Sequence, residues 1–415
     1  MKILHINCAD FGSTGKIVSD ISEFAKSKGH ESFLITPIIT QNSKAITKIR
    51  TSVKYEQGLY RRIAKVLGYR YGFAPISTIR ILFNIKKIKP DVVHLHSINC
   101  GMVNIYALVK FLKKHHIPTV VTNHAEFFYT GSCEHAYPCE KWKTGCGGCE
   151  NYKIACSSFS DTSDKAWKKM KNAFSGFEEA FATSVSPYIF SRSIQSPIFD
   201  GIEQKTVLNG INTDVFYPRT EIEDDVKKSF KNKSVLFVTA AFDPLTFDGK
   251  GGGYIVELAR RFEKDNVDFI VIGRNIKREI ELPQNLSVLG NISNQDRLAQ
   301  YYSVADLSVI TSKRETFSMP VAESLACGTP IVGFKAGGPE SISIDEFSEF
   351  VDYGDIDSLE RIIREKWINA KEHLSVETIS KAASDKFSYD KMAEEFLNIY
   401  KVVIERNENR NPNLS

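Results

Sequence analysis

The chain has 415 residues, of which 42% are hydrophobic and 25% charged, and its formal net charge is +4. This length allows two or three domains with full hydrophobic cores. The composition is that of a globular protein and excludes a disordered or fibrous chain, and so small a net charge gives no argument for nucleic-acid binding.

Neither a signal peptide nor a membrane span is expected. The apolar stretch at residues 3–6 is too short for the core of a signal peptide and runs directly into a polar, glycine-containing loop. No segment reaches the ~18 apolar residues that a membrane-spanning helix needs. We therefore expect a cytoplasmic protein whose eight cysteines stay reduced, so they are not read first as a disulfide framework.

Short apolar strands alternate with helical segments along the chain. The first series of strands is predicted at residues 3–6, 33–35, 91–96 and 119–122. After a polar turn cluster at 209–212 a second series follows, at 235–238, 267–273, 307–310 and 330–333. This alternation predicts an α/β fold with two doubly wound, Rossmann-like domains, residues 1–205 and 206–385, facing each other across a ligand-binding cleft.

Two glutamates flank a predicted helix start in the second domain. Glu315 lies in the loop after the strand at 307–310, and Glu323 lies about one turn into the helix. Pro320 suits the first helical position. The free N–H groups of a helix start attract phosphate, and carboxylates accept hydrogen bonds from vicinal sugar hydroxyls. The plainer alternative is a solvated loop glutamate and a structural helix glutamate.

This segment resembles the E-x7-E donor motif of the family 4 retaining glycosyltransferases, which have the GT-B fold. Residues 209–216 and 334–340 are similar to two further signatures of that family, so the resemblance spans nearly the whole chain. It implies an acceptor-binding domain at 1–205 and a donor-binding domain at 206–385. It also implies that residues 386–415 form a helix that crosses back to the first domain, followed by a polar tail.

The resemblance assigns donor-binding roles to five residues. It implies that Glu323 holds the ribose of a nucleotide and that Glu315 contacts the transferred sugar. The backbone N–H groups of Phe317, Ser318 and Met319 would contact the diphosphate.

A glycine loop follows the first predicted strand. Gly12 and Gly15 allow close backbone approach to a ligand, and the helix that begins there favours an anion. The loop is not a Walker A motif, because Ile17 stands where that motif has serine or threonine. A plain tight turn is the alternative, but the loop looks like the first glycine loop of colanic-acid-type family members, where it approaches the donor phosphates.

Lys250 and the glycine after it resemble the family's Lys-Gly pair that binds the diphosphate. Many members also carry an arginine at the end of the preceding strand, where this chain has Thr239, Ala240 and Ala241. Arg274 and Arg314 are the candidates to replace that cation. A lysine in a glycine-rich loop is otherwise usually a solvent-exposed residue.

His124 follows the strand at 119–122. A lone histidine is often structural, although its pKa suits proton chemistry. The family resemblance implies that this histidine reaches the transferred sugar and the reacting centre. His94 and His96 are expected in strand packing or on the cleft floor.

A cysteine-rich insertion occupies residues 130–150, with Cys133, Cys139, Cys146 and Cys149. Four thiolates match a closed tetrahedral zinc site, and the C-x2-C half has typical zinc spacing, but the C-x5-C half is looser. We predict one structural zinc, with His135 as an alternative ligand. Free thiols and disulfides are the other interpretations, and a similar insertion occurs in the colanic-acid-type relatives.

The stretch from Lys44 to Lys89 is basic, with Glu56 as its only acid. Its cations are Lys48, Arg50, Lys54, Arg61, Arg62, Lys65, Arg70, Arg80, Lys86 and Lys87. Apolar residues recur between them at helical spacing: Tyr60, Ile63, Leu67 and Tyr71. The pattern favours a helix lying on an anionic inner-membrane surface, with a solvated basic face as the alternative. Nucleic acid is not expected as a partner.

Together these features predict a retaining glycosyltransferase with His124, Lys250 and Glu315 as catalytic residues. It would transfer a sugar from a nucleotide-diphosphate sugar to a lipid-linked glycan acceptor, in synthesis of a surface polysaccharide such as exopolysaccharide, capsule or O-antigen. No Asp-x-Asp metal motif follows a predicted strand, so no cofactor is required for catalysis. A nucleotide-sugar epimerase and a non-catalytic sugar-binding subunit are the rival interpretations.

Overall fold

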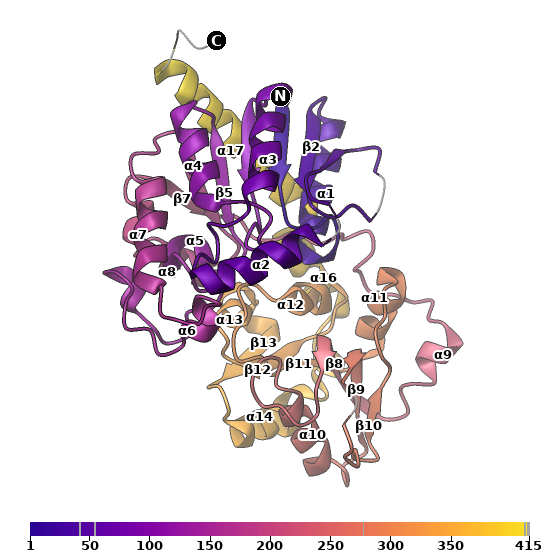
Figure 1. The fold of residues 1–415 in the computed structure, drawn as a ribbon. Helices are drawn as coiled ribbons and strands as arrows, with labels where there is room; N and C mark the ends of the chain where they lie inside the picture. Colours follow the sequence, from indigo (N-terminus) through magenta and orange to yellow (C-terminus); the bar gives the residue numbers. More distant parts are fainter. Residues whose placement is uncertain (41–42, 54, 277, 411, 413–415) are drawn as a thin grey trace. The chain divides into compact units, whose positions relative to one another are not determined.

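The computed structural model describes residues 1–40, 43–53, 55–276, 278–410 and 412. The chain divides into two compact units (Figure 1): Met1–Leu208 together with Asp390–Ser415, and Asn209–Tyr389. Each unit has one parallel sheet with helices packed on it, so the predicted α/β class with two doubly wound units is confirmed. No helix in the described ranges combines the length and the apolar character needed to cross a bilayer.

The first unit is built on a seven-stranded parallel sheet of order β3-β2-β1-β4-β5-β6-β7. Its strands are β1 Lys2–Ile6, β2 Glu31–Thr36, β3 Thr47–Arg50, β4 Val92–Leu95, β5 Thr119–Asn123, β6 Ala180–Ser184 and β7 Glu203–Thr206. The side chains of β4, β5 and β6 are buried throughout, as expected where helices cover both faces of a parallel sheet.

One or more helices lie between most successive strands of this unit. They are α1 Gly12–Ser27, α2 Glu56–Leu67, α3 Pro75–Ile88, α4 Ile105–Lys114, α5 Phe127–Thr130, α6 Tyr152–Ala155, α7 Ser163–Phe174 and α8 Pro187–Ser193. Two 3-10 turns, η1 Lys141–Lys143 and η2 Pro197–Phe199, complete the set.

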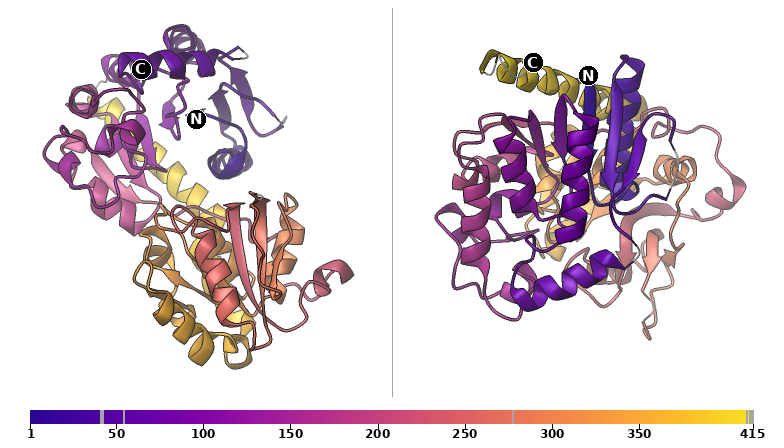
Figure 2. Two further views of the ribbon diagram at one scale, coloured as in Figure 1. Left: turned by 60° about the horizontal axis from the view of Figure 1, so that its bottom comes forward. Right: turned by 45° about the horizontal axis from the view of Figure 1, so that its top comes forward.

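The C-terminal helix α17 (Tyr389–Arg410, yellow in Figures 1 and 2) also packs on this sheet. The hydroxyl of Tyr400 lies 2.6 Å from Nδ1 of His94 on β4. Farther along the helix, Arg406 pairs with Glu203 of β7 at 2.5 Å. The last segment of the chain therefore completes the unit that the first segment begins.

The second unit has a six-stranded parallel sheet of order β10-β9-β8-β11-β12-β13. The strands are β8 Lys233–Phe242, β9 Val267–Asn275, β10 Leu286–Val288, β11 Leu307–Ile310, β12 Ile331–Phe334 and β13 Ser348–Val351. The helices are α9 Asp224–Lys227, α10 Gly252–Arg261, α11 Gln295–Val304, α12 Met319–Ala326, α13 Gly338–Ile342, α14 Ile356–Ile362, α15 Ala370–His373 and α16 Val376–Phe387, with the short turns η3 Asp345–Phe347 and η4 Ile363–Trp367.

Both sheets reverse their strand order beside the first strand of the unit. In the first unit β1 lies between β2 and β4, and in the second unit β8 lies between β9 and β11. In open parallel sheets ligands bind at the carboxyl ends of the strands at such a reversal. The loops that follow β1, β4, β8 and β11 are therefore the places to look for a site, and most of the predicted site residues lie on them.

Candidate active site

The loop that carries Glu315 is fixed by the neighbouring loop after β12. Glu315 N donates to the carbonyl of Ala336 at 2.9 Å, and Gly338 N donates to the carbonyl of Glu315 at 2.9 Å. A side chain at position 338 would place its Cβ 2.6 Å from the backbone nitrogen of Phe317, so only glycine fits there. The two loops thus lie against each other and hold Glu315 in place.

Lys250 forms an ion pair with Glu315. The loop after β8 is brought to the loop after β11 by Thr311, whose hydroxyl donates to the carbonyls of Lys250 and Gly251 at 3.0 Å each. Gly251 has φ +71°, and a Cβ there would lie 2.2 Å from the carbonyl oxygen of Thr311. The Lys250 side chain is 43% exposed, so its ammonium can exchange the carboxylate for an incoming anion.

The start of α12 is the predicted diphosphate contact, and its cap residue has an unusual backbone. The residue before it, Ser318, has φ +82° and is buried, a strained conformation for a residue other than glycine. The side chain of Ser318 makes no capping hydrogen bond, so it leaves the first N–H groups of the helix available to other partners. The helix begins at Met319. Pro320 is therefore its second residue, whereas the sequence suggests that it is the first.

Glu323 lies on the second turn of α12 and is buried. The phenol of Tyr302 on α11 donates to Glu323 Oε2 at 3.2 Å. Burial, reinforced by the charge of Glu323, raises the pKa of Tyr302 well above its usual value, so the phenol stays protonated and remains a donor. Tyr302 is therefore a further candidate site residue, which the sequence did not reveal because nothing in its local pattern distinguishes it from a core tyrosine.

Arg274 lies close to the position where many family members carry an arginine that this chain lacks. In the ladder between β8 and β9 it pairs with Ala241, in the stretch where many family members carry their cation. It is exposed near the end of β9, whereas Arg314 is half-buried next to Glu315. Arg274 is therefore the better placed of the two candidates.

In the first unit the glycine loop after β1 is tightly folded. Asn7 ties it to the end of β4, because its Oδ1 accepts from Ser97 N at 3.2 Å and its Nδ2 donates to Thr14 Oγ1 at 3.2 Å. Gly12 has φ +73°, and a Cβ on Gly15 would lie 2.6 Å from the backbone of Asp10. The start of α1 has no side-chain cap, so both predicted glycines shape an open helix start.

His124 follows β5 and joins a group of buried histidines. Its Nε2 lies 3.1 Å from Nδ1 of His96, and Nε2 of His96 lies 3.1 Å from Nδ1 of His5. Burial lowers the pKa of His5 and of His124 to about 3, and it lowers the pKa of His94 and His96 well below the usual value. All four imidazoles are therefore neutral near pH 7. His5 has no sequence signal as a site residue, since only the strand order places β1 beside β4.

The four predicted metal ligands are free thiols gathered in one region. Burial raises the pKa of Cys133, and the nearby thiols of Cys146, Cys149 and Cys139 add to the effect. The residue types fit zinc, whose bonds to sulfur are about 2.3 Å long. Within the described residues, however, the one group that brings three ligand atoms within 4.8 Å of one another is made of histidines, so these sulfurs are spread more widely than in a closed tetrahedral site. Zinc at this insertion stays a prediction.

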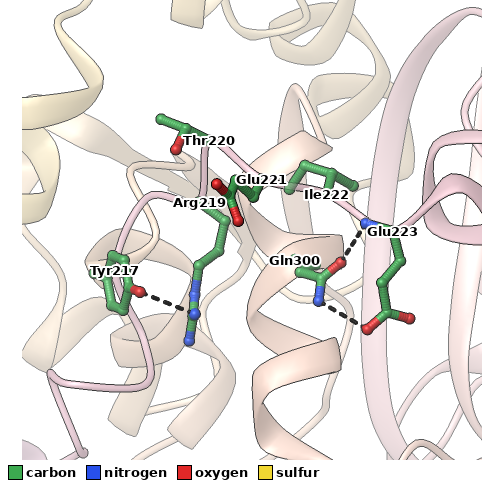
Figure 3. Close-up of a pocket in the computed structure, with 7 residues that line it drawn as sticks. All are labelled: Tyr217, Arg219, Thr220, Glu221, Ile222, Glu223 and Gln300. Atoms are coloured by element: carbon green, nitrogen blue, oxygen red, sulfur yellow. Dashed lines mark hydrogen bonds between the residues drawn. The ribbon is translucent and has the colours of Figure 1, made fainter.

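A polar pocket of the second unit lies away from the predicted site residues in sequence (Figure 3). Its lining is Tyr217, Arg219, Thr220, Glu221, Ile222, Glu223 and Gln300. Several of these groups satisfy one another: Arg219 donates to the Tyr217 hydroxyl at 2.9 Å, and Gln300 binds both the backbone and the side chain of Glu223. None of the predicted donor-binding residues lines it, so we do not assign the donor to this pocket.

Each of the two units matches a known glycosyltransferase family. The family described as "Glycosyltransferase Family 4" matches residues 14–145, and the family "Glycosyl transferases group 1" matches residues 219–383. The chain belongs to the family 4 glycosyltransferases of GT-B type. Lys250, Glu315 and Glu323 all lie inside the second match, and His124 lies inside the first.

Known proteins agree with this assignment. The chain is 26% identical over 206 residues to a "probable sucrose-phosphate synthase" of Thermosipho melanesiensis, an alignment that covers 46% of this chain and 45% of that protein. The chain thus spans about half the length of the curated relatives that it matches.

Solved structures share the fold along the whole chain. A sucrose-phosphate synthase of Thermosynechococcus elongatus has a TM-score of 0.68 at 16% identity, over 98% of this chain and 99% of that one. HepE of Anabaena, solved in complex with UDP-glucose, has a TM-score of 0.62 at 15% identity, over 97% of this chain and 100% of that one. At these identities the likeness establishes the fold alone.

Proposed function

We propose that this protein is a retaining glycosyltransferase that uses a nucleoside diphosphate sugar as donor. The observation that carries the proposal is the Lys250–Glu315 ion pair beside the uncapped start of α12, with buried Glu323 on that helix. This set offers a cation and N–H donors to a diphosphate and two carboxylates to sugar hydroxyls. The donor class is further supported by HepE, a protein of the same fold that was solved with UDP-glucose.

The chemistry assigned to these groups is mainly electrostatic. As the bond between the sugar and the diphosphate breaks, negative charge grows on the leaving phosphate. In this proposal Lys250, Arg274 and the start of α12 stabilise that charge, which is usually the largest catalytic contribution. The acceptor hydroxyl attacks from the same face of the sugar, and its proton passes to the departing phosphate. Glu315 holds the transferred sugar, and Glu323 holds the ribose.

A screen of nucleotide-sugar donors, with release of the nucleoside diphosphate as the readout, tests this proposal. We expect one donor class to be consumed, and Glu315→Gln to lower kcat by a factor of roughly 100 or more while binding is retained. Glu281→Gln, at an exposed position outside the site, is the matched control. Full activity of Glu315→Gln would refute the site. An epimer formed without any acceptor would favour the epimerase, and donor binding without turnover would favour the non-catalytic subunit.

The proposal extends to the acceptor, a lipid-linked glycan at the inner face of the cytoplasmic membrane, in synthesis of a surface polysaccharide. Its support is the set of exposed side chains on α2 and α3, here together called the α2–α3 face. On α2, Leu59, Arg62 and Val66 share one exposed stripe, and Val66 is 70% exposed. On α3, Ile79 and Phe83 are exposed one turn apart, with 68% of Ile79 open to solvent.

The α2–α3 face differs from the face expected from the sequence. Tyr60 and Tyr71 point into the core: the Tyr60 phenol donates to Glu56 Oε1 at 2.6 Å, and the Tyr71 phenol donates to the Ser132 carbonyl at 2.7 Å. Four of the predicted cations bind other parts of the unit: Lys48, Arg50, Arg70 and Arg80. Lys54 lies outside the described residues. The exposed cations on the two helices are Arg61, Arg62, Lys65, Lys86 and Lys87.

Exposed apolar stripes next to exposed cations suit an anionic bilayer, because the apolar side chains enter the interface while the cations bind the headgroups. The two helices are joined where Arg80 of α3 pairs with Glu56 at the start of α2, at 2.9 Å. This ion pair links α3 to the start of α2, and both helices are labelled in Figure 1. We therefore favour a peripheral location on the membrane.

A further inference from the structure

Three imidazoles of the first unit form one hydrogen-bonded row, here called the histidine row: His5, His96 and His124. His5 lies on β1, and His96 and His124 follow β4 and β5 directly. Nδ1 of His5 is 3.1 Å from Nε2 of His96, and Nδ1 of His96 is 3.1 Å from Nε2 of His124. All three are buried, and burial keeps them neutral near pH 7.

Proton counting leaves only two arrangements of this row. A neutral imidazole has one N–H and one lone pair. Because His96 has only one N–H, it donates on one side of the row and accepts on the other. In the inward arrangement His124 donates to His96, which donates to His5. In the outward arrangement His5 donates to His96, which donates to His124, so every ring carries its proton on Nδ1.

The two ends of the row decide between these arrangements. Nε2 of His5 is buried and has no hydrogen-bond partner. The inward arrangement would put an N–H there, and buried N–H groups without an acceptor are rarer in native proteins than buried acceptors without a donor. Nδ1 of His124 is not among the buried polar atoms of the described residues that lack a partner, and it is the ring nitrogen that the row leaves open.

We propose that His5 and His96 are positioning residues that hold His124 in the Nδ1–H tautomer. His124 then presents a neutral N–H donor to an oxygen of the sugar or phosphate and cannot take a proton at that nitrogen. The proposal rests on the proposed function, and on the expectation from the family resemblance that His124 reaches the transferred sugar. It assigns the acceptor's proton to the departing phosphate and gives His124 no part in moving it.

A metal ion explains these histidines less well. His5, His94 and His96 do offer ligand atoms within 4.8 Å of one another. Both ring nitrogens of His94, however, already have partners at 2.6 Å, the Tyr400 hydroxyl and Thr122 Oγ1. The facing nitrogens of His5 and His96 are close enough to share a proton directly. An ion would have to break at least two of these hydrogen bonds, one at His94 and one at His96.

Long-range ¹H–¹⁵N correlation spectra of histidine-labelled protein read the tautomers directly. We expect His5, His96 and His124 all to carry the proton on Nδ1. A proton on Nε2 of His124 overturns the proposal, as does a shift of the His5 and His96 ring nitrogens that saturates at one equivalent of added zinc. This measurement on the unmodified protein needs no transfer activity, so it stands apart from any failure of the proposed function.

Variants at position 96 test the dependence of His124 on the row. His96→Phe removes the donor, so His124 should gain a population of the Nε2–H tautomer, and kcat should fall roughly 10- to 100-fold, as expected for the loss of one hydrogen bond to a charged group. His96→Asn keeps an N–H near the position of Nδ1 and should restore both readouts. His94→Phe is the control, because His94 is equally buried and packs on His96, but its hydrogen bonds go to Tyr400 and Thr122 and not to the row. An unchanged His124 tautomer in His96→Phe overturns the proposal.

Discussion

Reversing the exposed charges of α2 should release the protein from anionic membranes. The perturbation is the triple variant Arg61→Glu, Arg62→Glu, Lys65→Glu, at three exposed positions of the α2–α3 face. None of the three has an ion-pair partner among the described residues, so the fold should be retained. The matched control carries the same change of charge at exposed lysines of the second unit: Lys227→Glu, Lys228→Glu, Lys231→Glu.

The size of the effect follows from the number of cations. Each basic residue near an anionic leaflet contributes about 1 kcal/mol, so the loss of three weakens binding by about 3 kcal/mol, or roughly 100-fold. The attraction acts over a Debye length of about 8 Å at physiological salt and about 30 Å at 0.01 M. Cosedimentation with vesicles containing phosphatidylserine, at both salt concentrations, measures this partitioning.

The exposed apolar side chains of the α2–α3 face can be tested separately from its cations. Ile79→Ser with Phe83→Ser removes two side chains that would each contribute about 1.5–3 kcal/mol on burial in the interface. This loss should be nearly independent of salt, whereas the charge effect should not. If the unmodified protein fails to sediment with anionic vesicles at 0.01 M salt, the membrane proposal is wrong and the acceptor is a soluble glycan.

Three further predictions concern single positions. Tyr302→Phe should raise the KM for the donor about 5-fold with kcat little changed, because Glu323 loses one hydrogen bond of ~1 kcal/mol; an equal loss of kcat would contradict a binding role. Elemental analysis should find about one zinc per chain, with Cys146→Ser lowering both the zinc content and Tm; a metal-free, fully stable protein would exclude the site. Burial raises the pKa of Asp20 to about 6, so its ionisation costs stability as pH rises from about 4 to 6, and Asp20→Asn should raise Tm at pH 8 but not at pH 4.

Much of the fold and of the donor side could be predicted from the sequence, because both depend on local patterns. Alternating strands and helices predict parallel sheets, and the spacing of Glu315 and Glu323 around a proline predicts a carboxylate on each side of a helix start. Lys250 could be proposed only through its glycine neighbours. Its pairing with Glu315 depends on the order of β8 and β11 in the sheet, which local patterns do not determine.

The parts that the sequence did not predict depend on long-range contacts. Helix α2 carries two apolar stripes, and periodicity cannot tell which of them packs inward; the stripe with Tyr60 does, where its hydroxyl finds Glu56. His5 meets His96 only because β1 pairs with β4 in parallel register. The count of basic residues was misleading for a similar reason, since Lys48 and Arg80 pair with carboxylates inside the unit.

The position of helix α17 at the end of the chain affects the order in which the two units can finish folding during synthesis. The imidazole of His94 has its hydrogen-bond partner, the hydroxyl of Tyr400, only after translation of a further 306 residues. Until then the first unit also lacks the apolar side chains that Phe396 and Val403 bury against it. The second unit is continuous in sequence, from 209 to 389, so its translation ends before that of α17. The usual order of domain folding during synthesis, N-terminal first, is thus reversed at the last step here, and an early stop before Tyr400 leaves the N-terminal unit unfinished.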